Sequence, residues 1–236
     1  LDYFASSKLN VKEASSIIKS ISKACINSNC ALLGGETAEM PGHYVGNNFD
    51  LAGFAVGCID ENKILKNENV SDGNVLIGIE SSGPHSNGFS LIRKIIKESK
   101  ASKDEINEVI KSVLKPTLLY PKLILELTSI YKINSISHIT GGGLLENLPR
   151  SIPNDLFVEI NTSSWEIPEI FKWLQKYGKI SDIDMYRIFN CGIGMTIFVE
   201  EKDCKNIISH ISHSGFKSYM IGVVNKKSKQ NSVIFN

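Results

Sequence analysis

Interleaved helical and strand patterns place this chain in the α/β or α+β class. Several segments carry apolar residues at three- and four-residue spacing, which is typical of helices with one buried face. Short apolar runs typical of strands alternate with these segments, and no internal repeat occurs. With 236 residues, the chain is long enough for two modest domains.

The first predicted domain covers residues 1–62. Apolar residues from Val11 to Cys25 recur at helical spacing, which predicts a helix with one buried stripe. We expect a short strand at Ala31–Leu33, ended by a sharp turn that the pair Gly34-Gly35 forces. The segment from Phe49 to Ile59 predicts a second strand with small residues on one face.

The second predicted domain covers residues 63–236 and follows a polar stretch between Asp60 and Asp72. An unbroken apolar run, Val75 to Ile79, predicts a buried strand that leads through a glycine- and serine-rich loop into a helix from Phe89 to Lys97. The other expected helices are 104–114, 120–131, 168–177 and 203–213, and the other expected strands are 156–160, 195–199, 219–224 and 233–235.

Composition excludes several classes of protein. A net charge of +1, from 26 basic and 25 acidic residues, provides no long-range electrostatic attraction for nucleic acid or a membrane surface. Five cysteines without a close pair argue against a disulfide framework and a zinc site, so we expect a cytoplasmic protein. No apolar run reaches the roughly 18 to 20 residues that cross a bilayer.

Four segments are rich in glycine, hydroxyl and amide residues. Consecutive backbone N–H groups in such turns can form an anion-binding concavity. For a single loop, glycines that merely turn the chain are the more common explanation, but four loops together favour phosphate binding. None is a standard nucleotide motif, because Phe89 stands where a P-loop lysine belongs and Gly192-Ile193-Gly194 is not extended. The segments are 34–42, 81–88, 139–143 and 190–194.

A few titratable residues are candidates for chemistry. His85 lies inside a glycine and serine loop, where an acid, base or phosphate donor is as plausible as a structural role. Glu36 follows two glycines and can bind Mg²⁺, and for Glu39 a role as its partner is as plausible as that of a surface acid. His210 and His213 are spaced like a metal pair but lack a third ligand, so we interpret them as solvated.

Six ordered motifs resemble the phosphoribosylformylglycinamidine cyclo-ligase family from about Leu1 to Val224. One motif distinguishes this family from its relatives, namely the run Glu36-Thr37-Ala38-Glu39-Met40-Pro41-Gly42. The related thiamine-phosphate kinases, selenophosphate synthetases and hydrogenase maturation proteins carry other residues after the double glycine. The motifs are segments 1–5, 34–42, 82–88, 138–143, 146–150 and 186–195.

The resemblance implies an α+β (α/β layered) fold with the two-domain plan of that superfamily. Family members begin with a further segment, about the first third of the enzyme, which carries nucleotide-binding residues and much of the dimer-forming sheet. We expect this chain to lack that segment, so that its first domain is incomplete and its second complete. Catalysis and a homodimer are accordingly expected of the full-length protein.

The resemblance also implies an ATP-dependent closure of formylglycinamidine ribonucleotide to aminoimidazole ribonucleotide. We expect catalysis by His85 and Mg²⁺ binding by Glu36. We expect ATP to be bound by Gly34, Gly35, Thr37, Ser82, Gly83, Ser86, Asn87 and Gly88, and the ribonucleotide by Gly141, Gly142, Gly143, Asn147, Arg150 and Asn190. Two alternatives stay open: a small-molecule kinase of the same superfamily, and a truncated binding module without catalysis.

Overall fold

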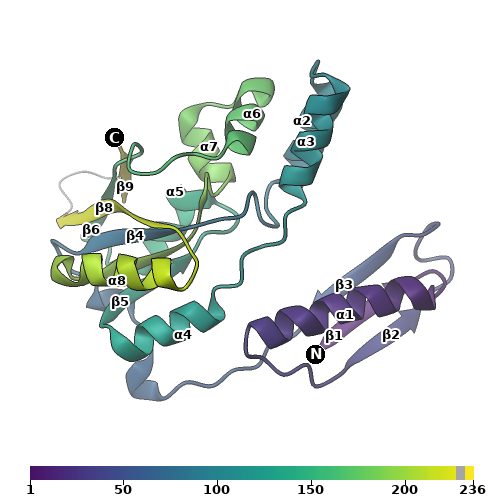
Figure 1. Cartoon of the computed structure of the whole chain (residues 1–236), viewed down its shortest axis with the longest axis horizontal. Helices are drawn as coiled ribbons and strands as arrows, with labels where there is room; N and C mark the ends of the chain where they lie inside the picture. The colour runs from purple at the N-terminus through teal and green to yellow at the C-terminus, as the bar shows by residue number, and fades with distance from the viewer. Residues whose placement is uncertain (227–231) are drawn as a thin grey trace. The chain divides into compact units, whose positions relative to one another are not determined.

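The structure is a computed structural model that describes residues 1–226 and 232–236. It divides into two compact units, each described here by itself (Figure 1). The first unit comprises residues 1–64 and 119–122, and the second unit comprises residues 65–118 and 123–236.

The first unit is built on a three-stranded sheet. Strand β1 (Asp2–Ser6) lies in the centre, parallel to β2 (Gly35–Glu39) and antiparallel to β3 (Phe49–Gly53). Helix α1 (Val11–Asn27) connects β1 to β2 and begins after Asn10, whose side chain accepts a hydrogen bond from the Glu13 N–H group. A short 3-10 helix, η1 (Glu61–Lys63), ends this part of the chain.

Few side chains are buried in the first unit. Its buried apolar residues are Phe4, Ala5, Ala14 and Tyr120, and the Phe4 ring stacks on Phe49 with 5.5 Å between centroids. Many large apolar side chains stay exposed, because one helix and three short strands cannot cover them. They are Leu1, Val11, Ile26, Leu33, Met40, Val45, Phe49, Leu51, Phe54, Val56, Ile59, Ile64 and Leu119.

The strand and turn predicted around the double glycine were wrong. Residues 31–33 form no strand, and β2 starts at Gly35 and runs through the segment that we expected to be a phosphate-binding turn. The pairing with β1 explains the difference, because β2 gains its backbone partners from a strand distant in sequence. The predicted strand Phe49–Ile59 is also shorter, since β3 ends at Gly53.

The second unit contains a six-stranded sheet in the order β5-β7-β4-β8-β6-β9. Every neighbouring pair is antiparallel except β6 and β9. The strands are β4 (Val75–Glu80), β5 (Ile133–His138), β6 (Leu156–Ile160), β7 (Ile193–Val199), β8 (Ser218–Lys226) and β9 (Val233–Phe235).

Helices cover both faces of this sheet (Figure 1). They are α2 (Phe89–Glu98), α3 (Lys103–Val113), α4 (Pro121–Ile130), α5 (Gly143–Asn147), α6 (Glu169–Gly178), α7 (Asp182–Ile188) and α8 (Glu201–His213), with 3-10 helices η2 (Asn67–Asn69) and η3 (Leu148–Ser151). The expected helices and strands of this unit are confirmed to within a few residues, whereas β5 and α7 were not expected.

Alternating side chains divide the core into two layers. Leu76 of β4 and Phe198 of β7 belong to one apolar cluster with residues of α2, α3, α5, α6 and α7. The neighbouring Ile77 and Val199 are fully buried but lie outside that cluster, because successive strand residues face opposite sides. Their side is the one that α8 covers, in contact with β4 and β8.

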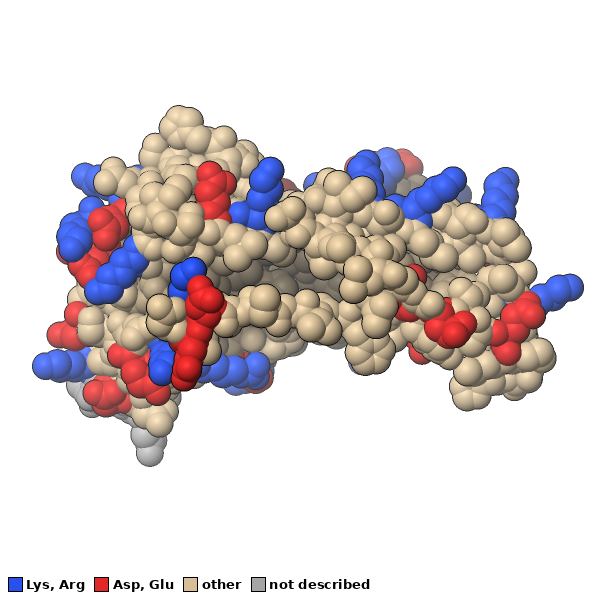
Figure 2. Space-filling view, turned by 90° about the horizontal axis from the view of Figure 1, so that it is seen from below, with Lys and Arg blue, Asp and Glu red and all other residues tan. Residues whose placement is uncertain are grey.

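The surface carries no dominant charge. On the face of the molecule seen in Figure 2, both acidic and basic side chains occur, and the net charge is +1. Among the described residues, no helix combines the length and apolar character needed to cross a bilayer.

Candidate functional site

Three of the four glycine-rich segments meet at one edge of the second unit's sheet. Strands β4 and β5 both run antiparallel to β7, so their carboxyl ends flank the start of β7. The Ser81 N–H group donates to the Gly192 carbonyl at 2.8 Å, and the Ile139 N–H group donates to the Gly194 carbonyl at 2.9 Å. The loops that follow β4 and β5 are therefore joined directly to the loop that precedes β7.

Asn190 fastens two of these loops together. Its Nδ2 donates to the Gly83 carbonyl at 2.8 Å, while its Oδ1 accepts from Ser81 Oγ and from the Gly192 N–H group, both at 2.9 Å. The side chain is only 2% exposed. Its amide thus holds the backbone of both loops, a role that the sequence did not suggest.

Asn147 holds the triple-glycine segment in a similar way. Its Nδ2 donates to the carbonyls of Gly141 and Gly143 at 3.1 and 2.7 Å, with a longer contact to Thr140. Gly142 and Gly143 have positive φ angles, and a Cβ on Gly143 would collide with the carbonyl oxygens of Tyr186 and Phe189. Only glycine fits this approach of two backbones.

His85 lies at the centre of the loop between β4 and α2. Its backbone has a φ of 56°, an uncommon left-handed conformation for a side chain of this size. The ring is 5% exposed, and its Nε2 accepts a hydrogen bond from the Ser82 N–H group at 3.3 Å. Burial, and then the charge of His138, lower the pKa of His85 to about 4, so the ring is neutral at pH 7 with its proton on Nδ1.

His138 is a member of this site that sequence reasoning missed. It is the last residue of β5 and directly precedes the triple-glycine segment. Desolvation lowers the pKa of His138 as well, so both imidazoles favour the neutral form. Its place in the motif before the glycines was visible in the sequence, but its proximity to His85 depends on the pairing of β5 with β7.

The other predicted residues of the β4–α2 loop differ in exposure. Ser82 Oγ already donates to the Pro116 carbonyl at 2.6 Å, and Gly83 is buried. Ser86 is exposed and Asn87 is half-buried, so both can reach a ligand. Gly88 has a φ of 74° and lies against the Phe189 ring, where any Cβ would clash.

Two residues near the triple glycine have contrasting environments. Arg150, in η3, is exposed and can reach an anionic group. Cys191 is buried, its thiol contacts the Met185 carbonyl, and burial raises the pKa of Cys191 to about 12. A thiol held in its neutral form is a poor nucleophile, so Cys191 serves packing rather than covalent catalysis.

The remaining candidates, Gly34, Gly35, Glu36 and Thr37, belong to the first unit. Asp2 pairs with Gly35, and its carboxylate occupies the space that a Cβ on Gly35 would need. Glu36 pairs with Tyr3, so it faces the opposite side of the sheet from Asp2. One Glu36 oxygen accepts from the Thr37 N–H group at 2.9 Å, and the carboxylate is exposed.

These residues fit a magnesium ion only in part. Among the described residues, no three His, Cys, Asp or Glu side chains converge on one point. Mg²⁺ is commonly held by one or two carboxylates together with water and phosphate oxygens. Glu36 offers one such carboxylate, and the other ligands would come from water and a bound nucleotide.

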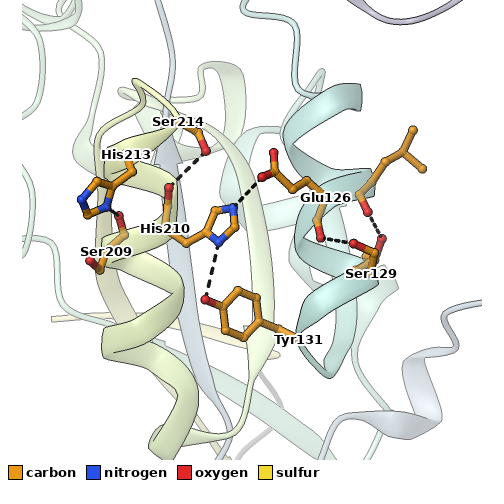
Figure 3. Close-up of polar contacts among 9 residues, drawn as sticks. Glu126, Ser129, Tyr131, Ser209, His210, His213 and Ser214 are labelled. Carbon is orange, nitrogen blue, oxygen red and sulfur yellow. Dashed lines mark hydrogen bonds and ion pairs between the residues drawn. The ribbon is translucent and has the colours of Figure 1, made fainter.

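His210 and His213 do not act as a pair. His210 Nε2 lies 3.1 Å from Glu126 Oε1, and its Nδ1 lies 3.5 Å from the Tyr131 hydroxyl, whereas the His213 ring turns back to the Ser209 carbonyl (Figure 3). The prediction that both are solvated was wrong for His210. Its ring links α8 to α4 beside an open surface pocket of about 560 Å³.

Comparison with known protein families covers nearly the whole chain. Residues 1–59 match the family described as AIR synthase related protein, N-terminal domain, and residues 71–234 match the corresponding C-terminal domain. A phosphoribosylformylglycinamidine cyclo-ligase of Citrifermentans bemidjiense is 45% identical over 232 residues, which are 96% of this chain and 67% of that relative.

Solved structures share the fold at much lower sequence identity. A thiamine-monophosphate kinase from Stenotrophomonas maltophilia matches with a TM-score of 0.64 at 12% identity, over 100% of this chain and 71% of the kinase. A hydrogenase maturation protein HypE in complex with ATP matches with a TM-score of 0.62 at 14% identity, over 99% of this chain and 68% of HypE.

Proposed function

The chain belongs to the AIR synthase related family, and from this premise we propose that it is the later part of an ATP-dependent cyclo-ligase of purine biosynthesis. Its reaction closes formylglycinamidine ribonucleotide to aminoimidazole ribonucleotide. The observation that carries the proposal is the 45% identity to a named cyclo-ligase across 96% of the chain. The convergence of three glycine loops around His85 supports it.

The chemistry requires activation and then positioning. A formamide oxygen is a poor leaving group, so ATP phosphorylates it and ADP departs. The amidine nitrogen of the same molecule then attacks the activated carbon, the ring closes and phosphate leaves. Holding both ends of one molecule in place can replace up to about 7–11 kcal/mol of the barrier.

The loops of the second unit provide that positioning in our proposal. The Gly141–Gly143 segment, which Asn147 holds in shape, and the exposed Arg150 bind the ribose phosphate. We assign His85, which burial keeps neutral, to proton transfer or to binding the formyl oxygen. Asn190 keeps the His85 loop in place rather than touching substrate.

The nucleotide-binding assignments are made for each unit by itself. In the first unit we assign Gly34, Gly35 and Thr37 to the nucleotide. In the second unit we assign the β4–α2 loop residues Ser82, Gly83, Ser86, Asn87 and Gly88 to the nucleotide. The structure of HypE with ATP, a protein of the same fold, supports ATP as the nucleotide. Glu36 would hold Mg²⁺, and the bound ion would offset negative charge on the transferred group.

Assembly and location are further parts of the proposal. Residues 1–62 are taken as the remainder of a nucleotide-binding domain, and residues 63–236 as the C-terminal domain. The exposed apolar side chains of the first unit, including Leu33, Phe54 and Val56, support a homodimer of the full-length protein. Five free cysteines support a reducing cytoplasmic location.

Site-directed variants of the full-length protein test the assignment. We expect His85→Ala and Glu36→Gln each to lower kcat by about 100-fold or more, because positioned donors and metal ligands contribute at that scale. Glu39→Gln is the matched control, since Glu39 lies on the same strand and accepts from the Leu9 N–H group. Near wild-type turnover in both site variants would show that the residues were assigned wrongly.

The product distinguishes the cyclo-ligase from the kinase alternative. Mass spectrometry of the product should show loss of phosphate and ring closure. A stable phosphorylated product would identify a kinase, and weak or absent ATP binding by the 236-residue chain in calorimetry would favour the truncated, non-catalytic module.

A further inference from the structure

A small cavity in the first unit lies at the carboxyl end of β1. It has a volume of about 40 Å³ and is lined by Phe4, Ser6, Lys8, Asn10, Glu13, Gly46, Asn47, Asn48 and Phe49. A cavity of this size holds about three water molecules. None of these residues belongs to the site described above, since Gly35 and Glu36 lie at the opposite end of the parallel pair β1 and β2.

Ser6 is the first indication of a ligand. Its side chain is 6% exposed, and within the described residues its Oγ has no hydrogen-bond partner. An unsatisfied buried hydroxyl costs roughly 1–3 kcal/mol, so such groups in native proteins usually have a partner, which is often not protein. The cavity is the space from which a partner for Ser6 can come.

The amino end of α1 is the second and independent indication. Asn10 caps this 17-residue helix, and the first turn carries a partial positive charge. Lys8 adds a full positive charge at the wall, and Asn47 and Asn48 add amide donors. Glu13 also lines the cavity, and its negative charge weakens the binding of an anion. Removal of this charge should therefore raise the affinity for an anion.

We propose that this cavity binds one small inorganic oxyanion of the phosphate class. Ser6 Oγ and the Lys8 ammonium group donate to it, and the amino end of α1 stabilises its charge. Phe4 and Phe49, stacked on one another, close the apolar side of the cavity. The site does not depend on the proposed reaction.

Titration of the full chain with inorganic phosphate, followed by isothermal calorimetry, tests the proposal. Ser6→Ala and Lys8→Met should each raise the Kd of one binding component by about tenfold, the scale of one lost charge-assisted hydrogen bond. Glu13→Gln should lower the same Kd several-fold, because it removes the opposing charge. Lys23→Met in α1 and His85→Ala in the second unit are controls that leave this component unchanged.

The opposite results would overturn the proposal. Phosphate binding that is equal in the wild type and in Ser6→Ala would mean that the cavity holds water only. Weaker phosphate binding in Glu13→Gln would also contradict the proposal, because removal of a negative charge from the cavity wall should favour an anion. Circular dichroism of each variant without phosphate verifies that a changed Kd does not reflect loss of the fold.

Discussion

The two units differ in how completely they bury their apolar residues. In the second unit, Phe171, Phe189 and Phe198 are fully buried between a six-stranded sheet and its helices. In the first unit, Phe54 and Val56 are 70% and 96% exposed. A well-packed core therefore holds the candidate residues of the second unit in place. The candidate residues of the first unit lie on an exposed strand, whose conformation can still change when it contacts another surface.

The largest expected effect compares one phenylalanine from each unit. Phe189→Ala removes a fully buried ring that packs on Phe171 and on Gly88, and we expect it to cost about 3–5 kcal/mol of unfolding free energy. Phe54→Ala should change stability by no more than about 0.5 kcal/mol.

Urea denaturation measures both variants. Trp165 and Trp173 both lie in the second unit, so tryptophan fluorescence reports that unit, and circular dichroism reports both. A large loss of unfolding free energy in Phe54→Ala would contradict this difference between the units, because it would mean that the Phe54 side chain is covered in solution.

The pH dependence of stability is the second prediction and concerns the second unit. Because the folded pKa of His85 is lowered to about 4 from 6.5, the unfolded chain binds the proton more readily. The contribution of neutral His85 is fully present above pH 6.5 and is lost as the pH falls towards 4, by up to about 3 kcal/mol.

His85→Asn should flatten this dependence between pH 6.5 and 4, as followed by tryptophan fluorescence during urea denaturation at each pH. The variant and the wild type are compared first at pH 8, where protonation makes no difference. An unchanged slope in the variant would mean that the imidazole is already charged in the folded protein.

The smallest predicted effect compares two polar side chains that bind backbone groups. Asn190→Ala leaves Ser81 Oγ and the Gly83 carbonyl without their buried partner, which we expect to cost about 2 kcal/mol. Glu39→Ala removes one exposed hydrogen bond to Leu9 and should cost less than about 1 kcal/mol.

Hydrogen exchange of segments 81–88 and 190–194 measures the first variant, and exchange of the segment around Leu9 measures the second. Equal losses of protection from hydrogen exchange in the two units would contradict the expectation that the buried hydrogen bonds of Asn190 stabilise more than the exposed one of Glu39. A loss confined to the two loops would also sharpen the positioning role of Asn190.

Much of the second unit follows from the sequence alone. The predicted strands at Val75–Ile79 and Leu156–Ile160 and the helical stripes of α2, α3 and α8 are local patterns, and each formed the expected element. The glycine segments and His85 were also identified locally, because glycine-rich turns between a strand and a helix have a recognisable composition.

Pairing between distant segments decided the rest. Residues 35–39 became a strand because β1 supplies its hydrogen bonds, and β5 became a strand because β7 does, although neither has an apolar run. The amides of Asn147 and Asn190 were expected to face substrate, yet they hold backbone carbonyls that only the folded chain brings near. The sequence determined which residues are candidates for chemistry, and the tertiary structure determined which of them touch one another, because hydrogen-bond partners are set by distance in space.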